Sequence, residues 1–398
     1  MRDQSRVYYV LVAANHGFFA VAFTLLLVYQ VSVAGLSAFQ LVVVGTVLEI
    51  TCFLGEVPTG LVADVWSRRL SVLIGFVLIG LSLILQGSLA TFWWILAAQV
   101  VWGLGYTFTS GAVEAWIFDE AGPDVFLRGQ RVALVASILG TCLAGALGAA
   151  SLRLPMLVAG AGYLILVAVL LLIMREHNFV PGHDRGSFTA MRRVFVAGVV
   201  QARRHPVVRS FLLISLLAGL SSEAFDRLWT AHVLASFTLP VSPAVFFAAF
   251  AVAGQLLALL ANIAVSRAAR SPHPSALLAL LTLAQVVGMA GLAVLQNLWL
   301  ALGSVLVRDA SRALSEPLQA AWLNRNVDSA SRATVLSVNN QFDAIGQIVG
   351  GPPLGALAGR TSIRVALLAS AGLLAPVAVL FSRLGRAARG PDPATRSS

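Results

Sequence analysis

The chain alternates between long apolar runs and short polar segments that carry most of its charged residues. The hydrocarbon core of a bilayer is about 30 Å thick, and an α-helix crosses it with about 20 apolar residues. Each run of this length is therefore interpreted as a membrane-spanning helix. The pattern predicts twelve such spans, at residues 7–31, 38–62, 70–88, 93–120, 129–151, 155–174, 207–233, 241–266, 275–294, 297–323, 332–356 and 362–383.

The composition favours a bilayer over water as the surroundings of these runs. Hydrophobic residue types make up 58% of the 398 residues and charged types only 11%, whereas about a quarter of a typical soluble domain is charged. Both cysteines, Cys52 and Cys142, lie within apolar runs, so the sequence indicates no metal site and no disulfide framework. We expect no cofactor and no enzymatic activity, because no lysine follows a phosphate-binding glycine loop and no G-x-S-x-G motif occurs.

The arginines give the predicted spans an orientation. With the N-terminus in the cytoplasm, 21 of the 27 basic residues, all arginine, fall on the cytoplasmic side, and only Arg153, Arg360 and Arg364 fall on the other side. Cytoplasmic loops of membrane proteins are enriched in arginine and lysine. The pattern predicts a multi-pass protein of the cell (inner or plasma) membrane with both termini cytoplasmic. It does not favour nucleic-acid binding, because the arginines lie at the ends of apolar runs.

The segment 175–206 interrupts the apolar pattern and leaves six spans on either side. We predict an N-terminal six-helix bundle over 1–174, a cytoplasmic linker over 175–206, a C-terminal six-helix bundle over 207–383 and a disordered tail over 384–398. The linker stretch from Ser187 to Arg204 has the pattern of an amphipathic helix that lies on the inner membrane surface.

The two halves show weak internal similarity. Span 5 begins at Arg131 and contains Gly145, and span 11 begins at Arg332 and contains Gly346. A duplicated six-helix unit is a recurring plan among transporters.

The loop between spans 2 and 3 reads GLVADVWSRR and contains Gly60, Asp64, Arg68 and Arg69. It resembles the signature loop of the major facilitator superfamily, G-x-x-x-D-R-x-G-R-R, with Val65 and Ser67 in place of a basic residue and a glycine. We predict a conformational latch in which Asp64 pairs with an arginine or with a helix N-terminus. The alternative is a simple turn whose arginines only orient the protein.

This resemblance implies a fold of twelve transmembrane helices in two pseudo-symmetric six-helix bundles. In drug-proton antiporters of the superfamily, span 4 carries an arginine near the place of Gln99, and a glycine-rich stretch of span 5 contains a proline. The corresponding stretch here has glycines at 140, 145 and 148 but no proline, whereas span 11 contains GQIVGGPPLG. These departures concern features of the antiporters and not the features that define the fold.

Ionisable residues inside the spans are the candidate functional residues, because charges in hydrocarbon are costly and are usually functional. In the resembled family, spans 1, 4, 7 and 10 line the central cavity, and most of these charges fall on those four spans. The proton-coupling candidates are Glu223 and Asp226, followed by Glu49. The further cavity charges are His16, Glu114, Arg227, Arg308 and Arg312.

Two roles stay open for each of these charges. A carboxylate whose arginine partner changes between states can carry a proton during transport. Buried arginines and carboxylates can also neutralise each other and fix helix packing, as the i, i+4 spacing of Glu223 and Arg227 permits.

Aromatic residues on spans 1, 4 and 7 predict an apolar cavity, which suits an amphiphilic or partly aromatic compound better than a sugar or phosphate. The leading prediction, from resemblance to the efflux branch, is proton-coupled efflux of hydrophobic or drug-like small molecules by alternating access. The alternatives are an importer or facilitator of a small metabolite on the same fold, and a non-transporting membrane sensor. The expected partners are a small-molecule substrate, protons and the lipid bilayer, and we expect a monomer.

Overall fold

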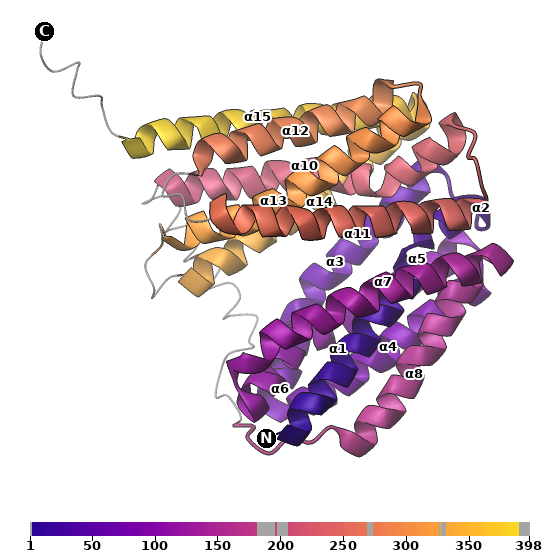
Figure 1. Ribbon diagram of the computed structural model, residues 1–398, viewed down its shortest axis with the longest axis vertical. Helices are drawn as coiled ribbons and strands as arrows, with labels where there is room; N and C mark the ends of the chain where they lie inside the picture. Colours follow the sequence, from indigo (N-terminus) through magenta and orange to yellow (C-terminus); the bar gives the residue numbers. More distant parts are fainter. Residues whose placement is uncertain are drawn as a thin grey trace, which may run out of the picture. The chain divides into compact units, whose positions relative to one another are not determined.

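In the computed structural model, the described residues are 2–180, 206–268, 274–325 and 332–389, with the single positions 196 and 327. These residues form helices and no strand. The predicted amphipathic helix of the linker lies outside the described residues, apart from Val196. The helices run side by side within each of two compact units (Figure 1).

The first unit contains the helices that correspond to the first six predicted spans. Two short helical turns, η1 (Val62–Trp66) and η2 (Pro123–Val125), follow α3 and α6. The helices are α1 (Arg2–Phe23), α2 (Leu26–Ser32), α3 (Ala38–Leu61), α4 (Arg68–Ser88), α5 (Phe92–Thr109), α6 (Ala112–Ala121), α7 (Phe126–Ala150) and α8 (Leu154–Ile173).

The second unit contains the helices of the remaining spans, except that residues 239–253 of the chain, with the first part of α11, group with the first unit. Its helices are α10 (Pro206–Ser236), α11 (Pro243–Ala268), α12 (Ser275–Val294), α13 (Leu298–Arg325), α14 (Arg332–Arg360) and α15 (Ile363–Arg389).

Nine stretches of the described residues are helical, long and apolar enough to cross a membrane. The three other predicted spans correspond to α5 with α6, to α13 and to α14. Each of these carries polar side chains within its apolar run, such as Gln99, Arg308 and Asn339. The spans that are too polar to be counted among these nine therefore include helices that carry candidate functional residues, such as Arg308 and Arg312 on α13.

Two predicted spans are broken rather than continuous. Span 4 is divided into α5 and α6 at Gly111, whose φ of 73° lies in the left-handed region that interrupts a helix. Span 1 is divided into α1 and α2 beside Thr24, whose hydroxyl donates to the Ala20 carbonyl at 2.6 Å. Such back-bonding often bends helices.

The last helix is longer than predicted. Helix α15 continues to Arg389, so residues 384–389, predicted to belong to a disordered tail, are helical. The stretch contains Ala387, Ala388 and Arg389, which favour helix formation. Residues 390–398 lie outside the described part of the chain.

The two units repeat the same helix pairings. In the first unit, α1 packs against α7 and α8, and α4 packs against α5 and α8. In the second unit, α10 packs against α14 and α15, and α12 packs against α13 and α15. The first and fifth, first and sixth, third and fourth, and third and sixth spans of each half are therefore neighbours, as expected for a duplicated six-helix unit.

Glycines allow the closest of these helix approaches. A side chain at Gly219 of α10 would collide with the carbonyl of Asp343 in α14, and one at Gly346 would collide with the carbonyl of Leu216. Small residues of this kind let membrane helices pack backbone to backbone. The close packing of α10 on α14 therefore depends on Gly219 and Gly346.

We expect Gly346→Leu to lower the thermal unfolding temperature of the detergent-purified protein, because overpacking costs about 1–3 kcal/mol or more. Gly303→Leu is the matched control, since a side chain there would meet no atom within 4 Å. Unfolding temperatures measured by fluorescence should fall for the first variant only. Equal temperatures for both variants would contradict the packing account.

Candidate functional site

A charged network joins α10 and α13 within the second unit. The carboxylate of Asp226 lies between two arginines, with Arg308 Nη2 donating to Oδ1 at 2.7 Å and Arg312 Nη1 donating to Oδ2 at 3.0 Å. The arginines are four residues apart on α13 and so occupy successive turns of one face. One carboxylate from α10 thus bridges two turns of α13.

Further ion pairs extend this network along each helix. Arg308 Nη1 also donates to Asp309 at 2.8 Å, and Arg312 Nε donates to Glu316 at 3.1 Å. Arg312 is therefore shared between a carboxylate on α10 and one on its own helix. On α10, Arg227 Nε donates to Glu223 at 2.9 Å in the i, i+4 arrangement that the sequence permits.

The network is buried on one side only, because the Asp226 and Arg312 side chains are 36% and 40% exposed. Arg308 is 7% exposed and Glu223 is 3% exposed. The guanidinium carbon of Arg308 lies 4.5 Å from the ring centre of Phe225, a cation–π distance. A side chain at Gly288 of α12 would lie 2.7 Å from Arg308 Cβ, so this glycine lets α12 approach α13 at the arginine.

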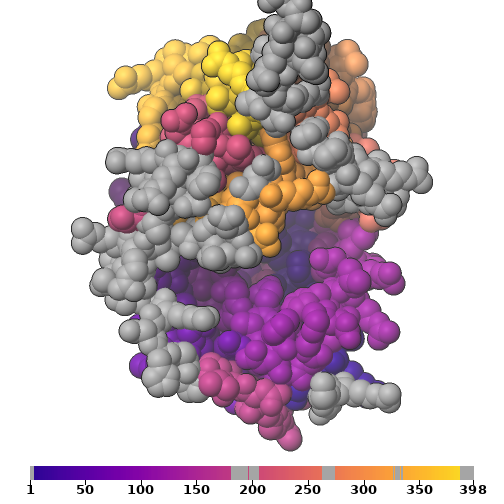
Figure 2. All heavy atoms as spheres, turned by 90° about the vertical axis from the view of Figure 1, so that its left-hand side faces the viewer, coloured from indigo at the N-terminus to yellow at the C-terminus, as the bar shows by residue number. Residues whose placement is uncertain are grey.

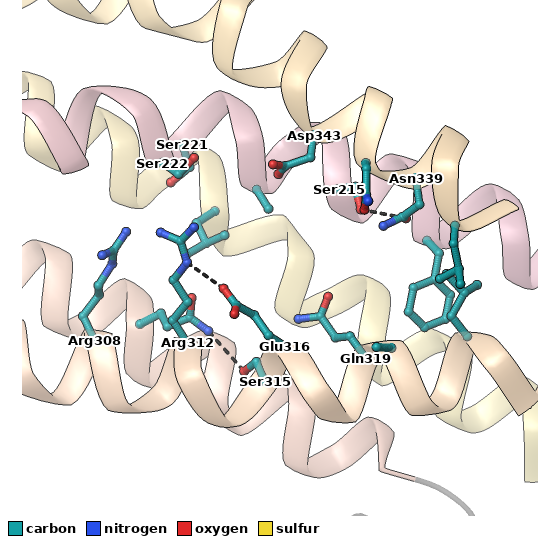
Figure 3. A pocket seen from close by; sticks show the side chains of 18 of the residues that line it. Ser215, Ser221, Ser222, Arg308, Arg312, Ser315, Glu316, Gln319, Asn339 and Asp343 are labelled. Atoms are coloured by element: carbon teal, nitrogen blue, oxygen red, sulfur yellow. Dashed lines mark hydrogen bonds and ion pairs between the residues drawn. The ribbon is translucent and has the colours of Figure 1, made fainter. Parts of the chain in front are cut away.

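A cavity of about 360 Å³ opens beside the network, and its lining comes from α10, α12, α13, α14 and α15. Figure 3 shows Arg312 and Glu316 on one side of it and Asp343 on the other. Hydroxyl and amide groups complete the wall, including Ser215, which donates to the Asn339 side chain at 2.8 Å. The wall also contains apolar side chains such as Phe211, Met289 and Leu374, so this polar cavity is one of mixed lining and not the aromatic cavity predicted from the sequence.

Asp343 is a candidate functional residue that sequence reasoning missed. Its carboxylate accepts a hydrogen bond from Gln347 at 2.8 Å, and among the described residues it has no ion pair. Span 11 was interpreted through its glycines and prolines. The polar run Asn339-Asn340-Gln341-Phe342-Asp343 inside an apolar span was the available signal.

The first unit contains a separate cavity of about 570 Å³. His16 of α1 and Glu114 of α6 both line it, so two predicted cavity charges do lie together. Its wall also includes the aromatic side chains Tyr8, Tyr106 and Phe126. The ring of Tyr106 stacks on Trp102 at a centroid distance of 5.4 Å, so this cavity has an aromatic wall.

Glu49, the remaining proton-coupling candidate, is half-buried on α3. It does not line either of these two cavities. The predicted coupling residues are therefore divided between the two units, with Glu223 and Asp226 in the network of α10.

The predicted latch residues Gly60, Asp64, Arg68 and Arg69 lie at the junction of α3 and α4. Arg68 forms an ion pair with Asp119 of α6, and its Nη1 donates to the Ala115 carbonyl at 2.9 Å. Asp64 has no ion pair or hydrogen bond within the described ranges. The predicted pairing of Asp64 is thus not seen in this structure, and its role as a latch stays a prediction.

Another carboxylate, Glu176, occupies the helix N-terminus near the predicted latch. It accepts hydrogen bonds from the Ser67 hydroxyl at 2.5 Å and from the Arg68 amide at 2.9 Å, at the start of α4. A carboxylate at this end of a helix is stabilised by the free amides and the helix dipole. Sequence reasoning missed Glu176 because it lies in the predicted linker.

The described residues contain no cluster of three or more histidine, cysteine or acidic side chains that could hold a metal ion. The site instead consists of charged pairs and polar cavities inside bundles of apolar helices. Repeated helix units with charges between them are typical of secondary transporters.

A model of the Major Facilitator Superfamily matches residues 7–351. The chain belongs to this superfamily and is a multi-pass membrane transporter, not an enzyme. The predicted fold class of twelve transmembrane helices in two pseudo-symmetric six-helix bundles is confirmed. A relative from Bacillus subtilis (strain 168), the uncharacterized MFS-type transporter YxaM, is 27% identical over 131 residues. The match covers 32% of this chain and 33% of that relative, so it spans about a third of the relative's length.

Solved structures share the fold at low sequence identity. The nucleoside transporter NupG has a TM-score of 0.78 at 16% identity, covering 95% of this chain and 98% of its own. A POT family transporter in complex with a thioalcohol-conjugated peptide has a TM-score of 0.73 at 14% identity, covering 96% of each chain. A bacterial homologue of the human lysosomal transporter Spinster, inward-facing and unoccupied, has a TM-score of 0.71 at 15% identity, with 96% of each chain covered.

We expect Asp226→Asn to destabilise the protein, because it leaves the buried Arg308 without its partner on α10. Adding Arg308→Gln should recover part of the loss, with a coupling energy between about 0.5 and 3 kcal/mol in a double-mutant cycle. The measurement is equilibrium unfolding in mixed detergent micelles.

Glu316→Gln is the control for this cycle. The Glu316 side chain is 65% exposed, and exposed ion pairs contribute about 0–1 kcal/mol. Strict additivity of Asp226→Asn and Arg308→Gln would show that the pair seen in the structure does not contribute to stability.

Proposed function

We propose that this chain is a proton-coupled secondary transporter of small organic solutes that works by alternating access. The observation that carries the proposal is the position of Asp343, a carboxylate without an ion pair in the described structure, on the cavity wall opposite Arg312. Arg312 in turn is bound to Asp226. A carboxylate that is not held in an ion pair, within a bundle of apolar helices, is more readily neutralised by a proton than a paired one.

The network provides a way to couple that proton to helix movement. With a proton on Asp343, Arg312 stays on Asp226 and holds α10 to α13. When Asp343 loses the proton, its negative charge competes for Arg312 and weakens the bridge between α10 and α13. Arg312 already divides its hydrogen bonds between Asp226 and Glu316, and its long side chain can exchange partners by changing rotamer.

The earlier coupling candidates keep distinct roles in this proposal. Asp226 is the fixed end of the bridge, and Glu223 neutralises Arg227 within α10. Glu49 stays a further candidate for proton coupling, after Asp343. Asp343 replaces Glu223 and Asp226 as the first choice for the group that binds and releases the proton.

The polar cavity favours a solute with several hydrogen-bonding groups. Its wall offers hydroxyl, amide and charged side chains, among them Ser222, Gln285, Gln319 and Asn340. The similar folds include a nucleoside transporter and a peptide-bound transporter, whose solutes are polar. This supports uptake or facilitated movement of a small polar metabolite.

Efflux of hydrophobic or drug-like molecules is the second candidate. The aromatic wall formed by Tyr8, Tyr106 and Phe126 in the first unit suits an amphiphilic compound, and Glu114 on the same cavity would suit a basic group on it. For either solute class we place the protein in the cell membrane with both termini cytoplasmic, from the arginine distribution.

We expect Asp343→Asn to abolish solute movement driven by a pH gradient in proteoliposomes, while solute exchange without a gradient continues. The reason is that a neutral amide at this position cannot release a proton but keeps the volume of the cavity wall. Asp226→Asn and Glu223→Gln, singly and together, are the comparison set. The assay follows radiolabelled nucleosides, amino acids and short peptides, and fluorescent dyes.

The outcomes separate the proposals. Gradient-driven movement of dyes but not of polar metabolites favours efflux of hydrophobic molecules. Gradient-driven movement of polar metabolites but not of dyes favours transport of a small polar metabolite. Full gradient-driven transport by Asp343→Asn removes Asp343 from coupling. Loss of gradient-driven transport in Asp226→Asn or Glu223→Gln, with full transport by Asp343→Asn, would assign the proton to a carboxylate of α10. Absence of any movement across the panel, with correctly folded protein, would favour a sensor.

A further inference from the structure

An apolar groove runs along the second unit, between α10 and α15, on the outside of the helices that form the polar cavity. Its volume is about 490 Å³, and Arg383 is the one charged residue in its wall. The remaining wall is aliphatic, glycine or proline: Leu213, Leu217, Gly372, Ala375, Pro376, Val379 and Leu380.

One face of α15 forms a side of this groove, and Gly372 and Ala375 are its small residues. Gly372, Pro376 and Leu380 are spaced four residues apart and so share one face of the helix. A side chain at Gly372 would meet no atom within 4 Å, so that end of the groove is open. Val379 beside it is 50% exposed. Both helices are long and apolar enough to cross the membrane, so this exposed face lies in hydrocarbon.

The charge lies at one end of the groove. Gly372 and Arg383 are eleven residues apart on α15, which corresponds to about 16 Å of helix. Half of a bilayer core is about 15 Å thick. The groove therefore has the depth of one leaflet, and Arg383 lies at its headgroup end.

A second arginine lies at the same end. Arg209 is one helical turn before Leu213 on α10 and is exposed. The start of α10 and the end of α15 lie next to each other in Figure 2. Within the described residues, neither Arg209 nor Arg383 forms an ion pair, so both guanidinium groups are available to an anion.

We propose that this groove binds an anionic phospholipid, with one acyl chain between α10 and α15 and the phosphate at Arg383. Guanidinium groups bind phosphate through charge-assisted hydrogen bonds. The arginine-rich side is the predicted cytoplasmic side, where anionic lipids attract basic residues near the surface. The bound chain would pack against the helix that carries Asp226, and the lipid would thereby stabilise one position of α10.

The test is native mass spectrometry of the detergent-purified protein, titrated with phosphatidylglycerol or with phosphatidylcholine of the same acyl chains. For the wild-type protein we expect a first phosphatidylglycerol to bind more tightly than phosphatidylcholine. Arg383→Gln should reduce that preference about fivefold, the effect of one basic residue near an anionic surface. Arg360→Gln, an exposed arginine at the opposite end of the helices, is the matched control and should leave the preference unchanged.

Variants that fill the groove should weaken the binding of both phosphatidylglycerol and phosphatidylcholine. Gly372→Leu places a side chain in the open space, and Val379→Trp fills the groove from an exposed position if the glycine variant does not fold. Gly303→Leu is the control for a leucine added at an open glycine. A preference that survives Arg383→Gln, or tight binding that survives Gly372→Leu and Val379→Trp, would overturn the proposal. Transport activity does not enter the readout, so the result is independent of the proposed function.

Discussion

One ion-paired bridge between two apolar helices, α10 and α13, organises the second unit. Asp226 on α10 is held by Arg308 and Arg312 on α13, and the buried guanidinium of Arg308 is stabilised because it is paired and hydrogen-bonded. The bridge therefore fixes the register of α10 against α13. Gly288 brings α12 close to the backbone of Arg308, and Gly219 and Gly346 bring α14 close to α10. The wall of the polar cavity, with Asp343 on it, follows from these approaches.

The two units share helix pairings but differ in chemistry. The cavity of the second unit combines arginines, carboxylates, hydroxyls and amides, whereas that of the first has aromatic rings with Glu114 and His16. The charged contacts of the first unit are instead concentrated where α4 begins, at Arg68, Asp119 and Glu176. The duplicated architecture thus carries two different sets of charged side chains, with the proposed coupling group in the second unit and the Arg68 ion pair in the first.

The fold could be predicted from the sequence because it depends on the lengths of apolar runs and on arginine counts, which are local properties. The break in span 4 could not, since it depends on the left-handed conformation of Gly111. The break in span 1, beside Thr24, has no comparable signal in the sequence. Asp226, Arg308 and Arg312 were identified singly, but their pairing depends on how α10 and α13 face each other. Glu176 reaches α4 from more than 100 residues away, a contact that no sequence spacing encodes.

The central claim is that Asp343 is the group that binds and releases the proton. Infrared difference spectroscopy of the reconstituted protein measures this directly, because a protonated carboxyl group has a carbonyl band that a carboxylate lacks. We predict a band that disappears as the pH is raised, that is absent from Asp343→Asn and that persists in Asp226→Asn. The same pH-dependent band in Asp343→Asn would contradict the account.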